Sequence, residues 1–274
     1  MNRRDQMQVI AVVNRKGGTG KTATAVNLAA EMAARGRRTL LVDLDTQGHA
    51  GISVGVRPPV GAPAVHDLFA DGEHPLPCPP QPTDLDALWV APADREFDRE
   101  VPADRHARLA RVLEETPWAD GFERVVIDTP PSLGGLLMNA LHAADAALIP
   151  FVPHHLSAEG VRQLAGLFFR VASGPNPRLT QLALLPTLVD PRIRIHRDVL
   201  EEMGHQFGPW RLLRGVRTDI RVAEASRAGR PVRLHAPRSR AAMDYWMLYE
   251  ELERLWGGGE HASPAAQPKE GATP

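Results

Sequence analysis

The chain has 274 residues, of which 43% are apolar and 24% are charged, so it is long enough to bury the core of one large α/β domain or two smaller ones. This composition excludes a disordered chain, a collagen-like fibre and a disulfide scaffold. The 32 basic and 33 acidic residues give a net charge of −1, so only a local concentration of charge could indicate a nucleic-acid or membrane partner.

The lysines and the single cysteine carry more information than these totals. Only Lys16, Lys21 and Lys269 are lysines among the basic residues, and the first two lie close together, which indicates positions that need a compact ammonium group. Cys78 alone cannot form an intrachain disulfide or a metal cluster. The apolar run at 9–13 is too short to span a bilayer, so we expect a soluble, cytoplasmic protein.

Hydrophobic periodicity predicts strands and helices that alternate along the chain. Short apolar runs predict strands at 9–13, 39–43, 87–90, 124–128, 146–152, 181–185 and 212–216. Longer amphipathic stretches predict helices at 22–35, 104–116, 136–143, 158–172, 196–207, 221–228 and 239–256. This alternation predicts the α/β fold class, with a single doubly wound, mostly parallel sheet and helices on both of its faces.

Two segments interrupt the alternation. Between 57 and 82 the chain carries eight of its 25 prolines around a short helix predicted at 65–70, which indicates a surface excursion. From 257 to 274 the residues are mostly Gly, Ala, Pro and charged types without periodicity, which predicts a disordered tail. We therefore expect one domain at 1–256 followed by this tail.

A glycine-rich segment with two lysines lies between the first predicted strand and the first predicted helix. In this position glycines let the backbone close around a polyphosphate, and the helix N-terminus stabilises its charge. Lys21 would reach the outer phosphates, and the Thr22 hydroxyl would ligate Mg²⁺. The predicted nucleotide-binding residues are Lys16, Gly17, Gly18, Thr19, Gly20, Lys21, Thr22 and Ala23.

Carboxylates follow two further predicted strands. Asp43 and Asp45 lie at the end of the strand at 39–43, and Asp128 ends the apolar strand at 124–128. Because the carboxyl ends of neighbouring parallel strands meet at one edge of a sheet, we expect these side chains near the glycine-rich loop. Asp128 has the Walker B arrangement, in which a carboxylate holds Mg²⁺ through water. The three segments together predict hydrolysis of the γ-phosphate of a nucleotide by positioning and charge stabilisation.

The loop departs from the general pattern G-x-x-x-x-G-K-[ST], because Arg15 occupies the first glycine position and Lys16 follows it. In this respect the chain resembles the deviant Walker A ATPases, whose loop is K-G-G-x-G-K-[ST]. The resemblance implies that ATP induces a sandwich homodimer, in which Lys16 touches the phosphates bound by the other subunit. It also implies that Asp45 positions or activates the attacking water and that Asp43 supports the magnesium shell.

Segments spread over residues 8–255 resemble the ParA partition ATPases within this group. The most specific of them is the arginine-containing segment at 221–231. The resemblance implies an ATP-bound dimer that holds non-specific double-stranded DNA and is released when a ParB-like partner stimulates hydrolysis, so that a chromosome or plasmid is segregated. Arg217 and Asp219 stand where the family has a proline and an asparagine near the adenine, which makes them candidate nucleotide contacts.

Positive charge is concentrated late in the chain. From 211 to 240 there are nine arginines against two acidic residues. This surplus predicts a sequence-independent DNA footprint dominated by phosphate contacts. Pairing of several arginines with acids elsewhere in the fold is the alternative. The candidate DNA-binding residues are Arg214, Arg217, Arg221 and Arg240.

Other functions share parts of this pattern. A MinD-like membrane ATPase would end in a basic amphipathic helix, and the chain after Trp256 has no such stripe, so we expect no membrane partner. An iron–sulfur reductase needs bridging cysteines that Cys78 alone cannot supply. A ParA-like ATPase that positions a protein cargo, such as a microcompartment or chemoreceptor array, stays open because it would bind ATP and DNA in the same way. With DNA as the partner, we expect a nucleoid-associated protein.

Overall fold

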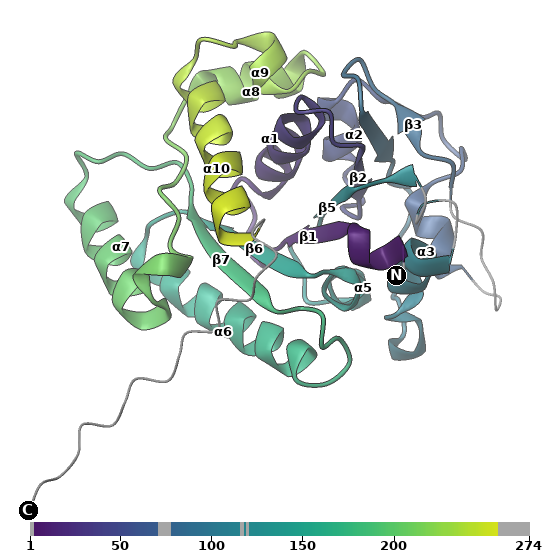
Figure 1. Ribbon diagram of the computed structural model, residues 1–274, viewed down its shortest axis with the longest axis horizontal. Helices are drawn as coiled ribbons and strands as arrows, with labels where there is room; N and C mark the ends of the chain where they lie inside the picture. Colours follow the sequence, from purple (N-terminus) through teal and green to yellow (C-terminus); the bar gives the residue numbers. More distant parts are fainter. Residues whose placement is uncertain (1–2, 71–77, 116–117, 119–120, 257–274) are drawn as a thin grey trace, which may run out of the picture.

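A seven-stranded sheet forms the centre of the computed structural model, which describes residues 3–70, 78–115, 118 and 121–256 (Figure 1). The strand order is β3-β4-β2-β5-β1-β6-β7. All neighbouring strands are parallel except β3 and β4, so the predicted doubly wound, mostly parallel sheet is confirmed. The strands are β1 (Gln8–Val12), β2 (Thr39–Asp43), β3 (Gln81–Pro82), β4 (Leu88–Ala91), β5 (Arg124–Asp128), β6 (Ala146–Phe151) and β7 (Gln181–Pro186).

Helices cover both faces of this sheet (Figure 1). One face carries α1 (Lys21–Ala33), α2 (His49–Ser53), α8 (Ile220–Arg227), α9 (Val232–His235) and α10 (Arg240–Trp256). The other face carries α3 (Arg108–Glu115), α5 (Gly135–Ala143), α6 (His155–Ala172) and α7 (Arg194–Phe207). Short 3₁₀ helices are η1 (Arg3–Gln6), η2 (Val65–Phe69), η3 (Ala103–Arg105) and η4 (Pro209–Arg211). None of the described helices is long and apolar enough to cross a membrane.

The strands supply two apolar cores because successive side chains point to opposite faces of a sheet. In β1, Val9 and Ala11 belong to the core under α3, α5, α6 and α7, whereas Ile10 and Val12 belong to the core under α1 and α10. All five residues of β2 are buried. A strand buried on both faces needs a continuous apolar run, and this explains the composition of the central strands.

The segment predicted as a strand at 212–216 forms only isolated bridges, so this prediction is wrong. It runs beside β7, with a bridge from Leu212 to Leu184. Gly215 has a φ of 94°, and a Cβ atom placed on it would lie 2.8 Å from the Pro186 carbonyl oxygen. This left-handed residue turns the backbone out of the extended conformation that a continuous ladder needs, while still allowing a close approach to β7.

The proline-rich segment at 57–82 does more than pass over the surface. Its 3₁₀ helix η2 places Val65, Leu68 and Phe69 in the core on the α3 face, and Cys78 is buried there as well. The description of this segment as a surface excursion is therefore corrected for these residues. The prolines restrict the backbone on either side of η2, so a short helix can return apolar side chains to the core. The predicted tail at 257–274 lies outside the described residues.

Candidate nucleotide and magnesium site

The loop between β1 and α1 has the backbone conformation that a phosphate site requires. Gly18 and Gly20 have φ values of 74° and 78°, in the left-handed region that residues with a side chain rarely adopt. Gly20 is the N-cap of α1, and no side chain caps this helix. The first amide groups of α1 are therefore available to an anion, and the helix dipole adds partial positive charge there.

Side chains from neighbouring segments hold this loop in place. Asn14 donates from Nδ2 to the Pro150 carbonyl oxygen (2.6 Å) and accepts the Lys16 N–H at Oδ1 (2.9 Å). The Thr187 hydroxyl, just after β7, donates to the Thr19 carbonyl oxygen (2.9 Å). The loop is thus organised before a nucleotide binds. The sequence pattern does not single out Asn14 or Thr187, because their contacts come from strands that are distant in the chain.

The predicted carboxylates meet the predicted lysine at the carboxyl edge of the sheet. Asp43 at the end of β2 is aligned with Asp128 at the end of β5, which is aligned in turn with Val12 at the end of β1. Lys21 is only 6% exposed and interacts with the charges of Asp128 and Asp45. Asp43, Asp45 and Asp128 are all buried. The structure therefore brings together one ammonium group and three carboxyl groups, as the motifs predict.

Burial dominates the electrostatics of this cluster. It raises the pKa of Asp128 to about 7, a shift that the nearby Thr22 hydroxyl and Lys21 ammonium oppose and the Asp45 charge reinforces. Burial, and then the charge of Asp128, raise the pKa of Asp43 well above its usual range. Burial also lowers the pKa of Lys21, against the attraction of the carboxylates. The excess of carboxyl groups over cations makes the cluster a place where a divalent cation would be stabilised.

The oxygen atoms of this cluster fit a hydrated magnesium ion. Both carboxylate oxygens of Asp128 and Oδ1 of Asp43 are buried without a hydrogen-bond partner among the described residues. The same part of the chain contains no group of three or more His, Cys, Asp or Glu side chains that could hold a metal by itself. Mg²⁺ in nucleotide sites keeps several waters and binds phosphate oxygens. Thr22 would therefore bind directly, and Asp43 and Asp128 would act through water.

A tight turn fixes the direction of Asp45. Its Oδ1 accepts the Gln47 N–H (3.1 Å), and its carbonyl oxygen accepts the Gly48 N–H (2.8 Å). Gly48 has a φ of 66° and begins α2 as its N-cap. The carboxylate is only 8% exposed, and its charge acts on Lys21 and Asp128. This position is suited to orienting a water molecule next to the outer phosphate.

A cavity of about 430 Å³ opens beside Thr22 and Ala23. Asp219 lines it, together with residues of α2 and α8, whereas Arg217 is not among its lining residues. The Asp219 carboxylate accepts the Arg221 N–H at the start of α8 (3.0 Å) and the Ala241 N–H (3.1 Å). Adenine contacts by Asp219 and Arg217 stay a prediction, and the placement favours Asp219.

Comparisons with known proteins identify the family. Residues 7–181 match a protein family described as an AAA domain. The chain is 37% identical over 259 residues to the chromosome-partitioning ATPase Soj of Thermus thermophilus, covering 91% of this chain and 96% of that protein. It is 36% identical over 250 residues to the chromosome partitioning protein ParA of Myxococcus xanthus, covering 89% of this chain and 87% of that protein. The chain belongs to the ParA family of ATPases.

A solved structure supports the same fold. The crystal structure of cobyrinic acid a,c-diamide synthase from Mycobacterium smegmatis, with a bound ATP analogue and magnesium, is 32% identical in sequence and has a TM-score of 0.72. The similarity covers 93% of this chain and 97% of that chain. Together with the relatives above, it confirms the resemblance to the ParA family that the loop and the carboxylates indicated.

In this ParA-family chain, four of the nine arginines between 211 and 240 have carboxylate partners. Arg217 binds Asp244 through its guanidinium (2.6 Å), and the Arg217 N–H donates to the same carboxylate (2.9 Å). Arg221 pairs with Glu224 one turn along α8 (2.5 Å). Pairs also join Arg230 to Asp84 and Arg233 to Glu31. These four arginines thus have carboxylate partners within the fold, and DNA contact by Arg217 and Arg221 stays a prediction.

Arg214 and Arg240 are exposed and, among the described residues, have no carboxylate within ion-pair distance. Both lie along α10: the Arg214 N–H donates to Glu251 (3.2 Å), and Arg240 is the first residue of the helix. Of the four predicted DNA-binding arginines, these two have guanidinium groups without a carboxylate partner in the described part of the chain, although Nη1 of Arg214 contacts the Met247 sulfur (4.0 Å).

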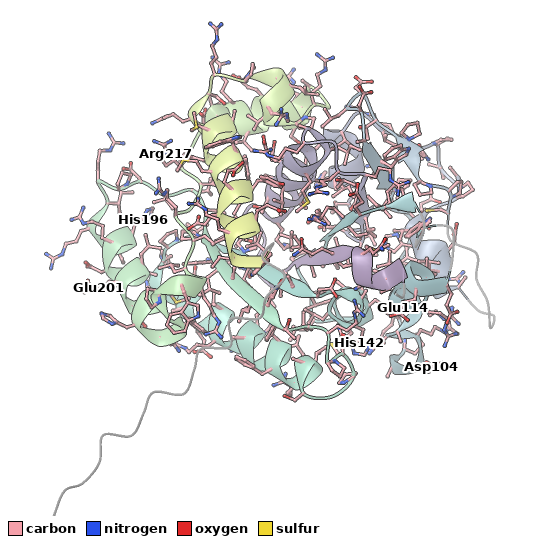
Figure 2. All side chains as sticks on the ribbon, viewed as in Figure 1. Asp104, Glu114, His142, His196, Glu201 and Arg217 are labelled. Carbon is pink, nitrogen blue, oxygen red and sulfur yellow. The ribbon has the colours of Figure 1, made fainter. Side chains whose placement is uncertain are left out.

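The loop before α7 adds arginines that the sequence pattern did not group with these. A bridge joins Val189 to Arg217, and Arg192 follows in the same loop, where it pairs with Asp190 (2.7 Å). Arg194 is the first residue of α7 and pairs with Asp198 (3.6 Å), and both arginine side chains are exposed. Figure 2 shows Arg217 and His196, at the start of α7, on the same side of the molecule. Only the fold brings these arginines together, because about twenty residues separate them in the chain.

Replacing Asp128 with Asn should raise the stability of the nucleotide-free protein at neutral pH. Because the folded-state pKa is about 7 and the ordinary value is 3.8, the folded protein holds a proton between these pH values that the unfolded chain has released. The contribution of this carboxyl to stability therefore falls as pH rises from about 4 to about 7. Asn cannot ionise, so the gain should be largest above pH 7 and absent near pH 4.

Thermal unfolding in EDTA checks this expectation. We expect Asp128→Asn to raise Tm by several degrees at pH 8, since about 1 kcal/mol corresponds to roughly 2–4 °C in a domain of this size. Equal melting temperatures at pH 8 would show that the buried carboxylate carries no electrostatic cost. Asp104→Asn, on an exposed residue of η3, is a matched control with no expected change (Figure 2).

Proposed function

We propose that this protein is a magnesium-dependent ATPase that forms an ATP-bound sandwich dimer, holds non-specific DNA and segregates a chromosome or plasmid. The observation that carries the proposal is the cluster of Lys21, Asp43, Asp45 and Asp128 at the end of a left-handed glycine loop, in a chain about 36% identical to chromosome-partitioning proteins. The name of the Thermus thermophilus relative, a chromosome-partitioning ATPase, supports the same activity.

The proposed chemistry follows from the charges at this site. The amides at the start of α1 and the Lys21 ammonium hold the β- and γ-phosphates, and bound Mg²⁺ would neutralise charge that develops on the phosphate oxygens. Asp45 orients a water molecule in line with the γ-phosphate. Thr22, Asp43 and Asp128 would hold the hydrated magnesium ion. Attack of the water oxygen on phosphorus breaks the bond to the β-phosphate oxygen, a proton of the water passes to the phosphate or to solvent, and ADP and phosphate result.

Exposure of Lys16 is consistent with contact across a dimer. Its side chain is exposed, although its backbone is held by Asn14 inside the loop. Lys21, five residues later, is buried in its own subunit. We infer that Lys16 reaches the phosphates of the other subunit once ATP brings two chains together. ATP binding would then cause the dimer to form, and a ParB-like activating protein would cause it to dissociate by stimulating hydrolysis.

A DNA-binding titration tests the nucleotide switch. A non-specific duplex is titrated with the protein in ATP, in ADP and without nucleotide, at two salt concentrations. We expect binding only with ATP, and weaker binding at the higher salt because phosphate contacts release counterions. Equal binding in all three nucleotide states would contradict the switch, and no binding in any state would remove DNA as the partner and favour a membrane or protein scaffold. A nucleoid location would follow from ATP-dependent DNA binding.

Removing the charges of Arg214 and Arg240 should weaken DNA binding without changing ATP affinity. Each lost phosphate contact reduces the slope of log K against log salt by about 0.9, so the double Ala variant should lose roughly tenfold or more in affinity at moderate salt. The control is the double Ala variant of Arg99 and Arg111, two exposed arginines outside 211–240, of which Arg111 belongs to α3, a helix away from α10 (Figure 1). Unchanged DNA retention in the Arg214 and Arg240 variant would place the footprint elsewhere.

Arg217 is a poor choice for this experiment. Its partner Asp244 is buried, with a side chain 6% exposed, so Arg217→Ala would leave a buried carboxylate without its counter-charge. Loss of DNA binding in that variant would then combine lost stability with lost contacts. The Arg214 and Arg240 pair has no such partner among the described residues, which makes its result easier to interpret.

The relative named as a diamide synthase supplies a second activity to consider. Amide synthesis through a thiol nucleophile would need a reactive thiolate. Cys78, the single cysteine of this chain, is 3% exposed, and burial raises the pKa of its thiol to about 12. The chemistry of this thiol therefore favours a partition ATPase over a thiol-dependent amide synthase.

A further inference from the structure

His66 is a buried histidine that connects three separate segments next to the nucleotide site. It lies in η2, and its side chain is 2% exposed. Its ring stacks on Phe97, with centroids 4.6 Å apart, and contacts Phe69 edge-on. Burying an imidazole is unfavourable unless both ring nitrogens are hydrogen-bonded. Both ring nitrogens of His66 have hydrogen-bond partners, and these partners determine which nitrogen carries the proton.

The partners of His66 determine its tautomer. Nδ1 accepts the Asp94 N–H (2.9 Å), so Nδ1 carries no proton. Nε2 therefore holds the proton and donates to the Leu44 carbonyl oxygen (3.2 Å). Burial also lowers the pKa of His66, in agreement with a neutral ring. The imidazole thus acts as a rigid link with one donor and one acceptor in defined directions.

The Leu44 carbonyl belongs to the peptide unit that leads into Asp45. Strand β2 ends at Asp43, and the Leu44 N–H still donates to the Asp128 carbonyl oxygen (3.0 Å). Leu44 is fully buried, and among the described residues His66 supplies the hydrogen bond to its carbonyl oxygen. The backbone immediately before Asp45 is therefore held by β5 through the Leu44 N–H and by His66 through the Leu44 carbonyl.

We propose that His66 is a positioning residue for Asp45, fixing through Nε2 the Leu44–Asp45 peptide unit and hence the direction of the Asp45 carboxylate. This inference rests on the proposed function, in which Asp45 orients the attacking water. Displacement of such a group by about 1 Å can cost up to about 100-fold in rate, because the reacting atoms must be aligned. A residue that acts in this way changes the rate of hydrolysis and leaves the affinity for ATP unchanged.

Two substitutions separate the two hydrogen bonds of His66. His66→Gln places an amide nitrogen near the position of Nε2, so it can still donate to Leu44 while the Asp94 contact is lost. His66→Asn places an amide oxygen near the position of Nδ1, so it can still accept from Asp94 while the Leu44 contact is lost. We expect kcat to fall about tenfold or more in His66→Asn and to stay within about threefold of wild type in His66→Gln. The Kd for ATP should stay the same in both variants.

A double-mutant cycle with Asp45→Ala tests whether His66 acts through Asp45. If it does, His66→Asn should cause no further loss of rate in the Asp45→Ala background. Equal rates for His66→Asn and His66→Gln, or an additive loss in the double variant, would overturn the proposal and leave His66 a purely structural residue. If His66→Asn does not fold, His66→Phe keeps the ring stacking, removes both hydrogen bonds and should show the same fall in kcat.

A matched control and the wild type complete the experiment. His142→Asn changes a half-buried histidine on α5 whose Nε2 has no partner among the described residues, and it should hydrolyse ATP at the wild-type rate (Figure 2). Absence of magnesium-dependent hydrolysis in the wild type, or no effect of Asp45→Ala, would overturn the proposed function and this inference together. A rate lowered by Asp45→Ala but not by His66→Asn would overturn the role of His66 alone.

Discussion

Lys21→Ala should weaken ATP binding by at least about 100-fold, the loss expected when a charge-assisted contact to a phosphate is removed from a buried site. Lys21 is the first residue of α1 and is 6% exposed. Removing its ammonium also leaves Asp43, Asp45 and Asp128 without their nearby cation, so the remaining carboxylates would repel the triphosphate. Calorimetric titration with a non-hydrolysable ATP analogue and magnesium measures this loss.

Two further variants define what the lysine contributes. Lys21→Arg keeps the positive charge but should not restore tight ATP binding, because a planar guanidinium is larger and differently shaped than the ammonium group of lysine. Lys16→Ala removes the exposed lysine, so it should bind ATP with nearly wild-type affinity but fail to dimerise. Tight ATP binding by a folded Lys21→Ala protein would contradict the assignment of the glycine loop to the nucleotide site.

Asp45→Ala should keep ATP binding and lower the rate of hydrolysis by about 100-fold or more, the range expected for loss of a group that positions or activates water. The protein should then accumulate as an ATP-bound dimer. Single-turnover phosphate release and light scattering in ATP and magnesium measure these two effects. An unchanged turnover rate would exclude Asp45 from the reaction.

Asp45→Asn is the matched variant, because it preserves the geometry of the turn. An amide oxygen can still accept the Gln47 N–H that binds Asp45 at 3.1 Å. Hydrolysis should nevertheless stay slow, because the amide carries no negative charge. If Asp45→Asn were as active as wild type while Asp45→Ala were inactive, Asp45 would act only by shaping the turn before α2.

Local patterns predicted most of the sheet. Six of the seven predicted strands end within one residue of the observed bounds, because strands buried on both faces need short continuous apolar runs. The strand at 212–216 was wrong because the periodicity does not reveal the left-handed conformation of Gly215. The strand β3 and the helices α2 and α9 were not predicted, since two to five residues are too few for a periodic signal.

The residues of the candidate site were likewise predicted only in part. The chain order of glycines, lysine and carboxylates predicted the cluster of Lys21, Asp43, Asp45 and Asp128. The lysine begins α1, the carboxylates end strands or follow them closely, and β1, β5 and β2 are neighbours in the sheet. Asn14, Thr187 and His66 could not be predicted, since each acts through a contact with a distant segment. Which of the arginines lack a carboxylate partner, as Arg214 and Arg240 do among the described residues, also depends on which carboxylates the fold places near each of them.

The sequence by itself determined the family, most of the strands and the residues expected to contact a nucleotide, because the glycine-rich loop, the helix that follows it and the strand ends are marked by local patterns. Tertiary structure alone decided which arginines lack a carboxylate partner among the described residues, which buried carboxylate oxygens lack a hydrogen-bond partner there and which side chains hold the turn around Asp45. Hydrogen bonds and ion pairs between distant segments depend on distances of a few ångströms, and these are set only when both apolar cores have packed against the sheet.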